Sequence, residues 1–324
     1  MALSQLPNSE QVISRRLWLL LWIFAFTAGC LSTPLSTPTP IAKTTIPATP
    51  AEVTRDTVFL AQYGWTVTQP LAVYQVTLPA SFEHSPGDFP LPIYWAYNNE
   101  FSKAIGLSLE PYLGKEVTAT LYALKEELPT FLRPYTQARA VIITDHEEII
   151  GAWIDTLGMV SFACSLERKP FNKIVQQRWG EWLLSAGVVN SSNALEQKLA
   201  QMTPEELITT YYQAIDEQDF HLAYATLSRQ QAVEYLFTNM RENDLFNQSY
   251  AEAFDGWPET IQMAKLESLK PIRPGSHEFE VWVDMKFSKA PPALPGDGKY
   301  LWFVIVTEEI EGLGWRIQSI GTGP

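Results

Sequence analysis

Residues 203–220 read TPEELITTYYQAIDEQDF, which is a strong signal for the start of an amphipathic helix. Thr203 is a favoured N-cap residue, Pro204 suits the first helical position, and Glu206 is placed to complete a capping box. Acidic residues in a first turn also interact favourably with the positive end of the helix dipole. The apolar residues that follow recur at three and four residues and so share one helix face: Leu207, Tyr211, Ala214 and Ile215.

After this helix, the apolar residues first keep a helical spacing and then alternate with polar ones. A second helix is expected over 220–227 and a third from Arg229 to about Asn239, with Ser228 as its cap. Period-two alternation then predicts four strands, over 260–269, 277–288, 300–308 and 315–320. The expected fold class of residues 203–324 is therefore α+β, with three helices and then a curled antiparallel sheet of four strands that forms a cone.

A second α+β region is expected upstream, over residues 54–189, with a polar link over 190–202 between the two. Short connections between its strands favour mostly antiparallel pairing. Expected helices are 56–63, 94–105 and 171–184. Expected strands are 65–68, 73–78, 115–123, 139–144, 149–154 and 159–165. Residues 145–148, Asp-His-Glu-Glu, would form a hairpin tip, which could hold a divalent ion but fits a solvated turn better.

The first 29 residues resemble a bacterial lipoprotein signal peptide that ends at Cys30. Arg15 and Arg16 precede the apolar run 17–28, which is about a dozen residues and shorter than the roughly 20 that a spanning helix needs. Lipid on Cys30 would hold the protein at the cell membrane on the extracytoplasmic face. The paired arginines fit both the general and the twin-arginine export route.

Residues 30–53 are rich in Ser, Thr and Pro and predict an extended linker. At ~3.1 Å per residue, such a linker could hold the folded part up to about 60 Å from the bilayer.

Composition narrows the class of protein further. The chain has 324 residues, 46% of them hydrophobic and 12% aromatic, which is enough for two packed domains. Its formal net charge of −13 argues against nucleic-acid binding and against attachment to anionic lipid through a basic patch. Of two cysteines, Cys30 would carry lipid, and Cys164 lies in an apolar run that predicts burial.

The C-terminal region resembles a nuclear transport factor two-like domain, the cone-shaped fold shared with ketosteroid isomerase. The resemblance is carried by residues 204–220, 223–228 and the closing strand 314–320. It implies a fold but little about function, because this fold serves enzymes, binding modules and accessory domains alike.

The N-terminal region resembles an uncharacterised domain of membrane-anchored proteins and lipoproteins from Gram-positive bacteria. The resemblance is carried by residues 63–67, 97–100, 106–115 and 149–155, and it implies no known activity.

The resemblance to the cone fold also suggests where a pocket could lie. In its isomerase branch a tyrosine on the first helix stabilises an oxyanion, and Tyr211 falls at that place. The aspartate of that branch has no convincing counterpart, so Glu234 or Asp216 would have to serve as base in an enzyme. The candidate pocket residues are Tyr211, Tyr212, Ile215, Tyr235, Trp257, Trp282 and Trp302.

No complete catalytic set, phosphate-binding loop, dinucleotide fingerprint or zinc spacing is recognisable, so no cofactor and no metal are expected. We therefore expect a non-catalytic binding or scaffolding protein of the cell envelope. Its pocket or inter-domain cleft would engage a small apolar ligand, a peptide or a protein partner.

Trp179, Trp182 and Phe171 could form an interface patch near the link. An isomerase- or dehydratase-like enzyme with Tyr211 as donor and a purely structural spacer are the alternatives.

Overall fold

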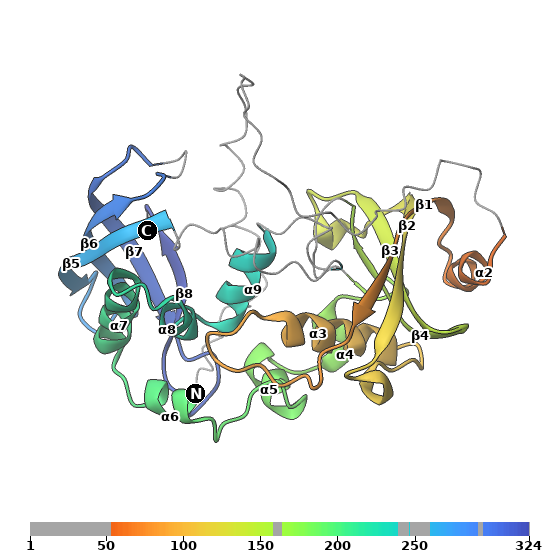
Figure 1. Ribbon diagram of the computed structural model, residues 1–324, viewed down its shortest axis with the longest axis horizontal. Coiled ribbons are helices and arrows are strands. Elements are labelled where there is room, and N and C mark those ends of the chain that lie inside the picture. The colour runs from red at the N-terminus through yellow and green to blue at the C-terminus, as the bar shows by residue number, and fades with distance from the viewer. Residues whose placement is uncertain (1–52, 158–163, 239–245, 247–259, 291–293, 324) are drawn as a thin grey trace, which may run out of the picture.

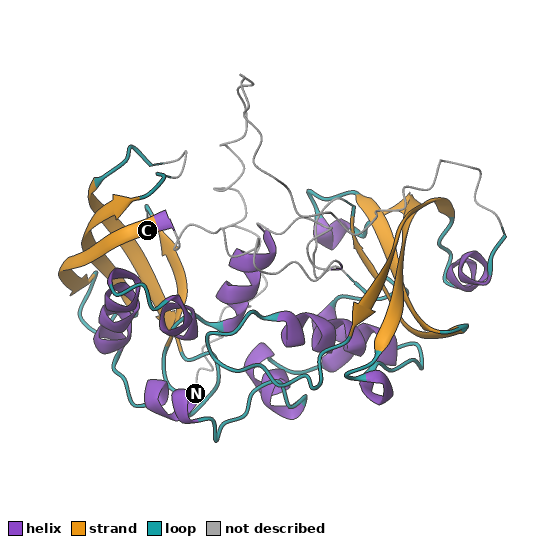
Figure 2. Ribbon diagram, in the orientation of Figure 1, coloured by secondary structure: helices purple, strands orange, loops and turns teal. Residues whose placement is uncertain are grey.

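The computed structural model is α+β, with two four-stranded antiparallel sheets and several helices (Figures 1 and 2). It describes residues 53–157, 164–238, 246, 260–290 and 294–323, with the backbone alone for 234–238. No helix in these described ranges is long and apolar enough to cross a membrane. The signal run, Cys30 and the linker up to residue 52 lie outside them.

The first sheet has helices on both faces. Its strands pair in sequence order and are β1 (Val67–Thr77), β2 (Glu116–Glu127), β3 (Gln137–Asp145) and β4 (Glu148–Thr156). Helix α2 (Arg55–Gln62) buries Leu60 against one face, and helix α3 (Leu91–Lys103) buries Tyr94 and Trp95 against the other. Because both faces are covered, almost every residue of β3 is buried. Two 3₁₀ turns connect the elements, η1 (Glu110–Tyr112) and η2 (Thr130–Leu132).

Two expectations for this region need correction. Residues 65–68 and 73–78, expected as separate strands, belong largely to the single strand β1, because Pro70 sits at a register shift of an edge strand, where proline is tolerated. The expected helix 171–184 is broken into α4 (Phe171–Val175) and α5 (Trp179–Ser185), because Gln176 adopts a left-handed conformation with φ of 53°.

The link contains a helix that the sequence analysis did not predict. Helix α6 (Ala194–Ala200) begins at Asn193, whose side chain accepts hydrogen bonds from the backbone N–H groups of Leu195 and Glu196. The expected strand over 159–165 lies mostly outside the described residues, and Cys164 forms an isolated bridge with Ile154.

The second region has the expected order of elements. Helices α7 (Pro204–Asp216), α8 (Phe220–Ala225) and α9 (Arg229–Thr238) precede strands β5 (Ile261–Pro271), β6 (Glu278–Phe287), β7 (Gly298–Thr307) and β8 (Arg316–Gly321). The capping box between Thr203 and Glu206 is formed in both directions. Helix α7 packs its apolar face on the sheet and forms a separate hydrophobic core with it.

The expected curl of this sheet is wrong. Central strands β6 and β7 keep continuous register from the pair Glu278–Ile305 to the pair Met285–Gly298. The register shifts fall in the edge pairs β5–β6 and β7–β8. Bulges bend the strands that contain them, and without one in the central pair these strands do not wrap around helix α7.

Candidate functional site between the two regions

Four of the predicted pocket residues lie together in the core of the second region. Tyr211, Tyr212 and Ile215 on α7 are at most 3% exposed, and Trp302 on β7 is 6% exposed. Asp216, one of the two alternative bases, accepts a hydrogen bond from the backbone N–H of Ala264 at 2.9 Å and so ties α7 to β5.

The remaining pocket residues are placed elsewhere. Trp282 is 41% exposed, because its strand neighbours Val281 and Val283 point into the core and alternation turns it to the opposite face. The side chain of Tyr235, like that of Glu234, is not described, and Trp257 lies outside the described residues.

A groove of about 900 Å³ lies where the two regions meet. Its walls are the first turns of α5, the connection between β7 and β8, and the start of α9. Figure 1 shows α9 between the two sheets, and Val233 of this helix packs into the core of the first region. The groove is therefore built from both regions at once.

Glu309 holds the walls of the groove together. Its carboxylate accepts hydrogen bonds from the indole N–H of Trp179 at 3.0 Å and from the backbone N–H groups of Arg229 and Gln230 at 3.0 and 3.1 Å. The first N–H groups of a helix have no partner within the helix and favour a negative charge. One buried carboxylate thus caps α9 and binds α5 of the other region.

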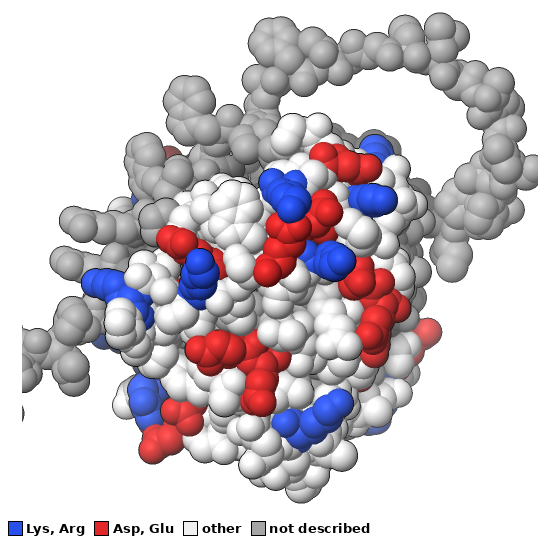
Figure 3. Space-filling view, turned by 90° about the vertical axis from the view of Figure 1, so that its left-hand side faces the viewer, with Lys and Arg blue, Asp and Glu red and all other residues white. Residues whose placement is uncertain are grey.

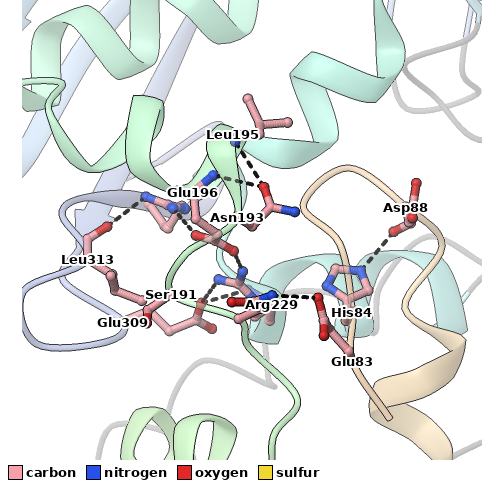
Figure 4. A network of polar contacts seen from close by, with 12 residues as sticks. Glu83, His84, Asp88, Ser191, Asn193, Leu195, Glu196, Arg229, Glu309 and Leu313 are labelled. Atoms are coloured by element: carbon pink, nitrogen blue, oxygen red, sulfur yellow. Dashed lines mark hydrogen bonds and ion pairs between the residues drawn. The ribbon is translucent and has the colours of Figure 1, made fainter. Parts of the chain in front are cut away.

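A buried charge cluster lies behind Glu309 (Figure 4). Arg229 pairs with Glu309 at 3.4 Å and with Glu196 of α6, and Glu196 also pairs with Arg316 of β8 at 2.5 Å. All four side chains are at most 5% exposed. Burial lowers the pKa of Arg316 to about 10 and lowers that of Arg229, and both remain cationic at neutral pH. Two cations and two anions balance in this layer.

His84 extends the contact between the regions. His84 is 5% exposed, and its Nε2 donates to the backbone carbonyl of Asp88 at 2.9 Å. The carboxylate of Asp88 lies 3.2 Å from His221 of α8. Burial, followed by the positive charge of Arg229, lowers the pKa of His84 to about 4, although Asp88 and Glu309 oppose the shift.

This shift predicts a pH-dependent stability. Between pH 6.5 and about 4, His84 is mostly protonated in the unfolded chain, where its pKa is 6.5, but mostly neutral in the folded protein. Protonation therefore favours the unfolded chain, and the free energy of unfolding falls as the pH drops from about 7 to 4. The contribution of this one group is up to about 3 kcal/mol. The check is denaturant unfolding across this pH range for the wild type and His84→Gln, whose amide can still donate to Asp88. The carboxylates titrate in both proteins, so parallel pH profiles would contradict the assignment.

Aromatic residues expected to form an interface patch pack within the chain. Trp182 is 2% exposed in the first core, with its ring 4.8 Å from that of Phe171. Trp179 lies half-buried at the groove. The patch is thus part of the contact between the two regions.

Other sequence candidates are structural in the described part of the chain. Cys164 is fully buried, and burial raises the pKa of its thiol to about 12, which leaves it unreactive. Asp145 and Glu148 flank an exposed hairpin turn in which His146 has φ of 53°. Among the described residues, no three His, Cys, Asp or Glu side chains are grouped to hold a metal ion.

Sequence reasoning missed the charged members of the site, Glu196, Arg229, Glu309 and Arg316. No local signal marked them. In the closing strand Arg316 takes the polar position between Trp315 and Ile317, and alternation alone would place its side chain on the exposed face.

Comparison with protein families finds two domains of unknown function. Residues 59–154 match the family model DUF4830, and residues 205–321 match the family model DUF4829. No match to a curated protein was found. Helices α5 and α6 lie between the two matched ranges. One wall of the groove therefore comes from a segment that neither model covers.

Proposed function

We propose that this protein is a non-catalytic binding protein of the cell envelope, anchored by lipid on Cys30, with the groove as its ligand site. The single observation that carries the binding role is the groove of about 900 Å³, whose walls come from both regions. Ligand sites commonly lie at domain interfaces and have volumes of roughly 300–1,000 Å³. The anchor is supported by the sequence around Arg15, Arg16 and Cys30.

For the second region we propose a relationship to the nuclear transport factor two-like fold. The support is the order of three helices followed by four sequentially paired antiparallel strands, together with the resemblance in residues 204–220. In this proposal the face of the sheet that packs on α7 is filled by side chains such as Tyr212 and Trp302. Ligand binding then falls to the groove.

The anchor is tested by metabolic labelling with a palmitate analogue in cells that express the full chain. We expect label and membrane sedimentation for the wild type, and loss of both for Cys30→Ala. Cys164→Ala is the matched control, because that thiol is buried and its replacement should leave the label in place. Equal labelling of wild type and Cys30→Ala would refute the anchor.

The groove is tested by a photo-crosslinking amino acid placed at Leu184, which lines the groove and is 42% exposed. Val73 on edge strand β1 is 49% exposed and serves as the matched control position. In intact cells we expect discrete adducts from position 184 and none from position 73. The same adducts from both positions would show that the groove is not the site of binding.

A further inference from the structure

The charged side chains around the groove form two layers that differ in net charge. The inner layer is the neutral cluster of Glu196, Arg229, Glu309 and Arg316 described above. The outer layer, at the rim, has three carboxylates and one guanidinium: Glu181, Glu308, Glu311 and Arg178. The rim therefore has a net charge of −2, which the inner layer does not offset.

The acidic excess at the rim is larger than that of the chain as a whole. The chain as a whole has 36 acidic and 23 basic residues, a ratio of less than two to one, while the rim has three to one. On the face of the molecule in Figure 3, basic and acidic side chains are interspersed. Concave surfaces lined by one sign of charge focus the electrostatic potential and attract ligands of the opposite sign.

The rim already holds one cation of this chain. The guanidinium of Arg178 is 2.7 Å from the carboxylate of Glu181 and 3.8 Å from that of Glu311, while its side chain remains 75% exposed. Glu311 is 90% exposed, and one oxygen of Glu308 accepts a hydrogen bond from the backbone N–H of Gly312. The carboxylates at the rim are thus placed where a second cation can reach them from solvent.

Apolar surface lies beside these charges. Leu184 is 42% exposed in the groove, and Trp179 is half-buried with its N–H directed to Glu309. A ligand that fits both features carries positive charge next to apolar side chains. The volume of about 900 Å³ is near the upper end of the range for small-molecule sites, which favours a short peptide over a single small cation.

We propose that the groove binds a cationic peptide segment in which lysine or arginine alternates with apolar residues. This inference rests on the proposed function and adds the chemical class of the ligand. The basic side chains would pair with Glu308 and Glu311, and the apolar ones would contact Leu184 and Trp179. The neutral inner layer would stay intact, because Glu309 is already fully engaged by Trp179 and α9.

The test uses the purified full chain in detergent and a fluorescent hexapeptide of alternating lysine and leucine. A hexapeptide of alternating glutamate and leucine is the probe of opposite charge. Binding is measured by anisotropy for the wild type and for the double variant Glu308→Gln, Glu311→Gln. The matched control, Glu116→Gln with Glu147→Gln, removes two exposed charges from the first region.

We expect the lysine peptide to bind the wild type. Its affinity for the groove variant should be about tenfold lower, and its affinity for the control variant should lie within about twofold of that for the wild type. Binding should weaken as salt is raised, and the glutamate peptide should bind far more weakly. Equal weakening in both variants would show attraction to overall charge and overturn the proposal, as would equal binding of the two peptides. Adducts at position 184 without a preference for the lysine peptide would refute this inference alone. Absence of both adducts and peptide binding would refute the proposed function as well.

Discussion

Replacing Glu196 by glutamine is expected to lower the free energy of unfolding by about 3–5 kcal/mol. Its carboxylate pairs with two arginines, Arg229 and Arg316, and it is 1% exposed. Glutamine retains the shape of the side chain but removes the negative charge. Two guanidiniums, at most 5% exposed, would then share the single carboxylate of Glu309. The cost arises from an uncompensated buried charge and not from lost volume.

The measurement is denaturant unfolding at pH 7, in comparison with Glu147→Gln. Glu147 is exposed at the hairpin turn, and its replacement should change the stability by less than about 0.5 kcal/mol. A loss below about 1 kcal/mol in Glu196→Gln would mean that the cluster does not hold the two arginines as charged groups.

Gly180→Ala is expected to destabilise the protein by about 3 kcal/mol, although alanine is the better helix former. Gly180 lies in α5, where propensity alone predicts a gain of about 0.5–1 kcal/mol. A Cβ atom here would overlap the backbone carbonyl oxygen of Glu309 and lie 3.2 Å from Cα of Ile310. Backbone cannot give way as a flexible side chain can, so the connection between β7 and β8 must move away from α5. Overpacking costs roughly 1–3 kcal/mol. The movement also breaks the hydrogen bond from Trp179 to Glu309, which increases the total cost.

Thermal and denaturant unfolding of Gly180→Ala show whether the steric overlap, which destabilises, outweighs the gain in helix propensity, which stabilises. Gly321→Ala is the control, because its Cβ would meet nothing closer than an oxygen of Gly323 at 3.8 Å. Increased stability of Gly180→Ala would show that α5 and the β7–β8 connection do not touch as described.

Local patterns predicted the elements of the second region well. The capping box at Thr203 and the alternation after residue 260 depend on neighbours in sequence, and both are present in the structure. The break at Gln176 and the missing curl were not predicted, since a left-handed residue and the position of bulges leave little trace in an apolar pattern. Alternation could have placed Trp282 outside the core, because Val281 and Val283 flank it.

The groove could not be predicted from local patterns. The contact between Trp179 and Glu309 joins residues 130 positions apart, and that between Glu196 and Arg316 joins residues 120 apart. Each of these side chains looks ordinary in its own segment. Only the way the two regions pack brings them together.

Helix α9 belongs to the second region in sequence but inserts Val233 into the first core, and Ile310 of the β7–β8 connection does the same. The stretches that match the two family models are therefore not modules that can be separated without damage. The first region expressed alone would lack these two side chains in its core, and the second region expressed alone would expose them to water.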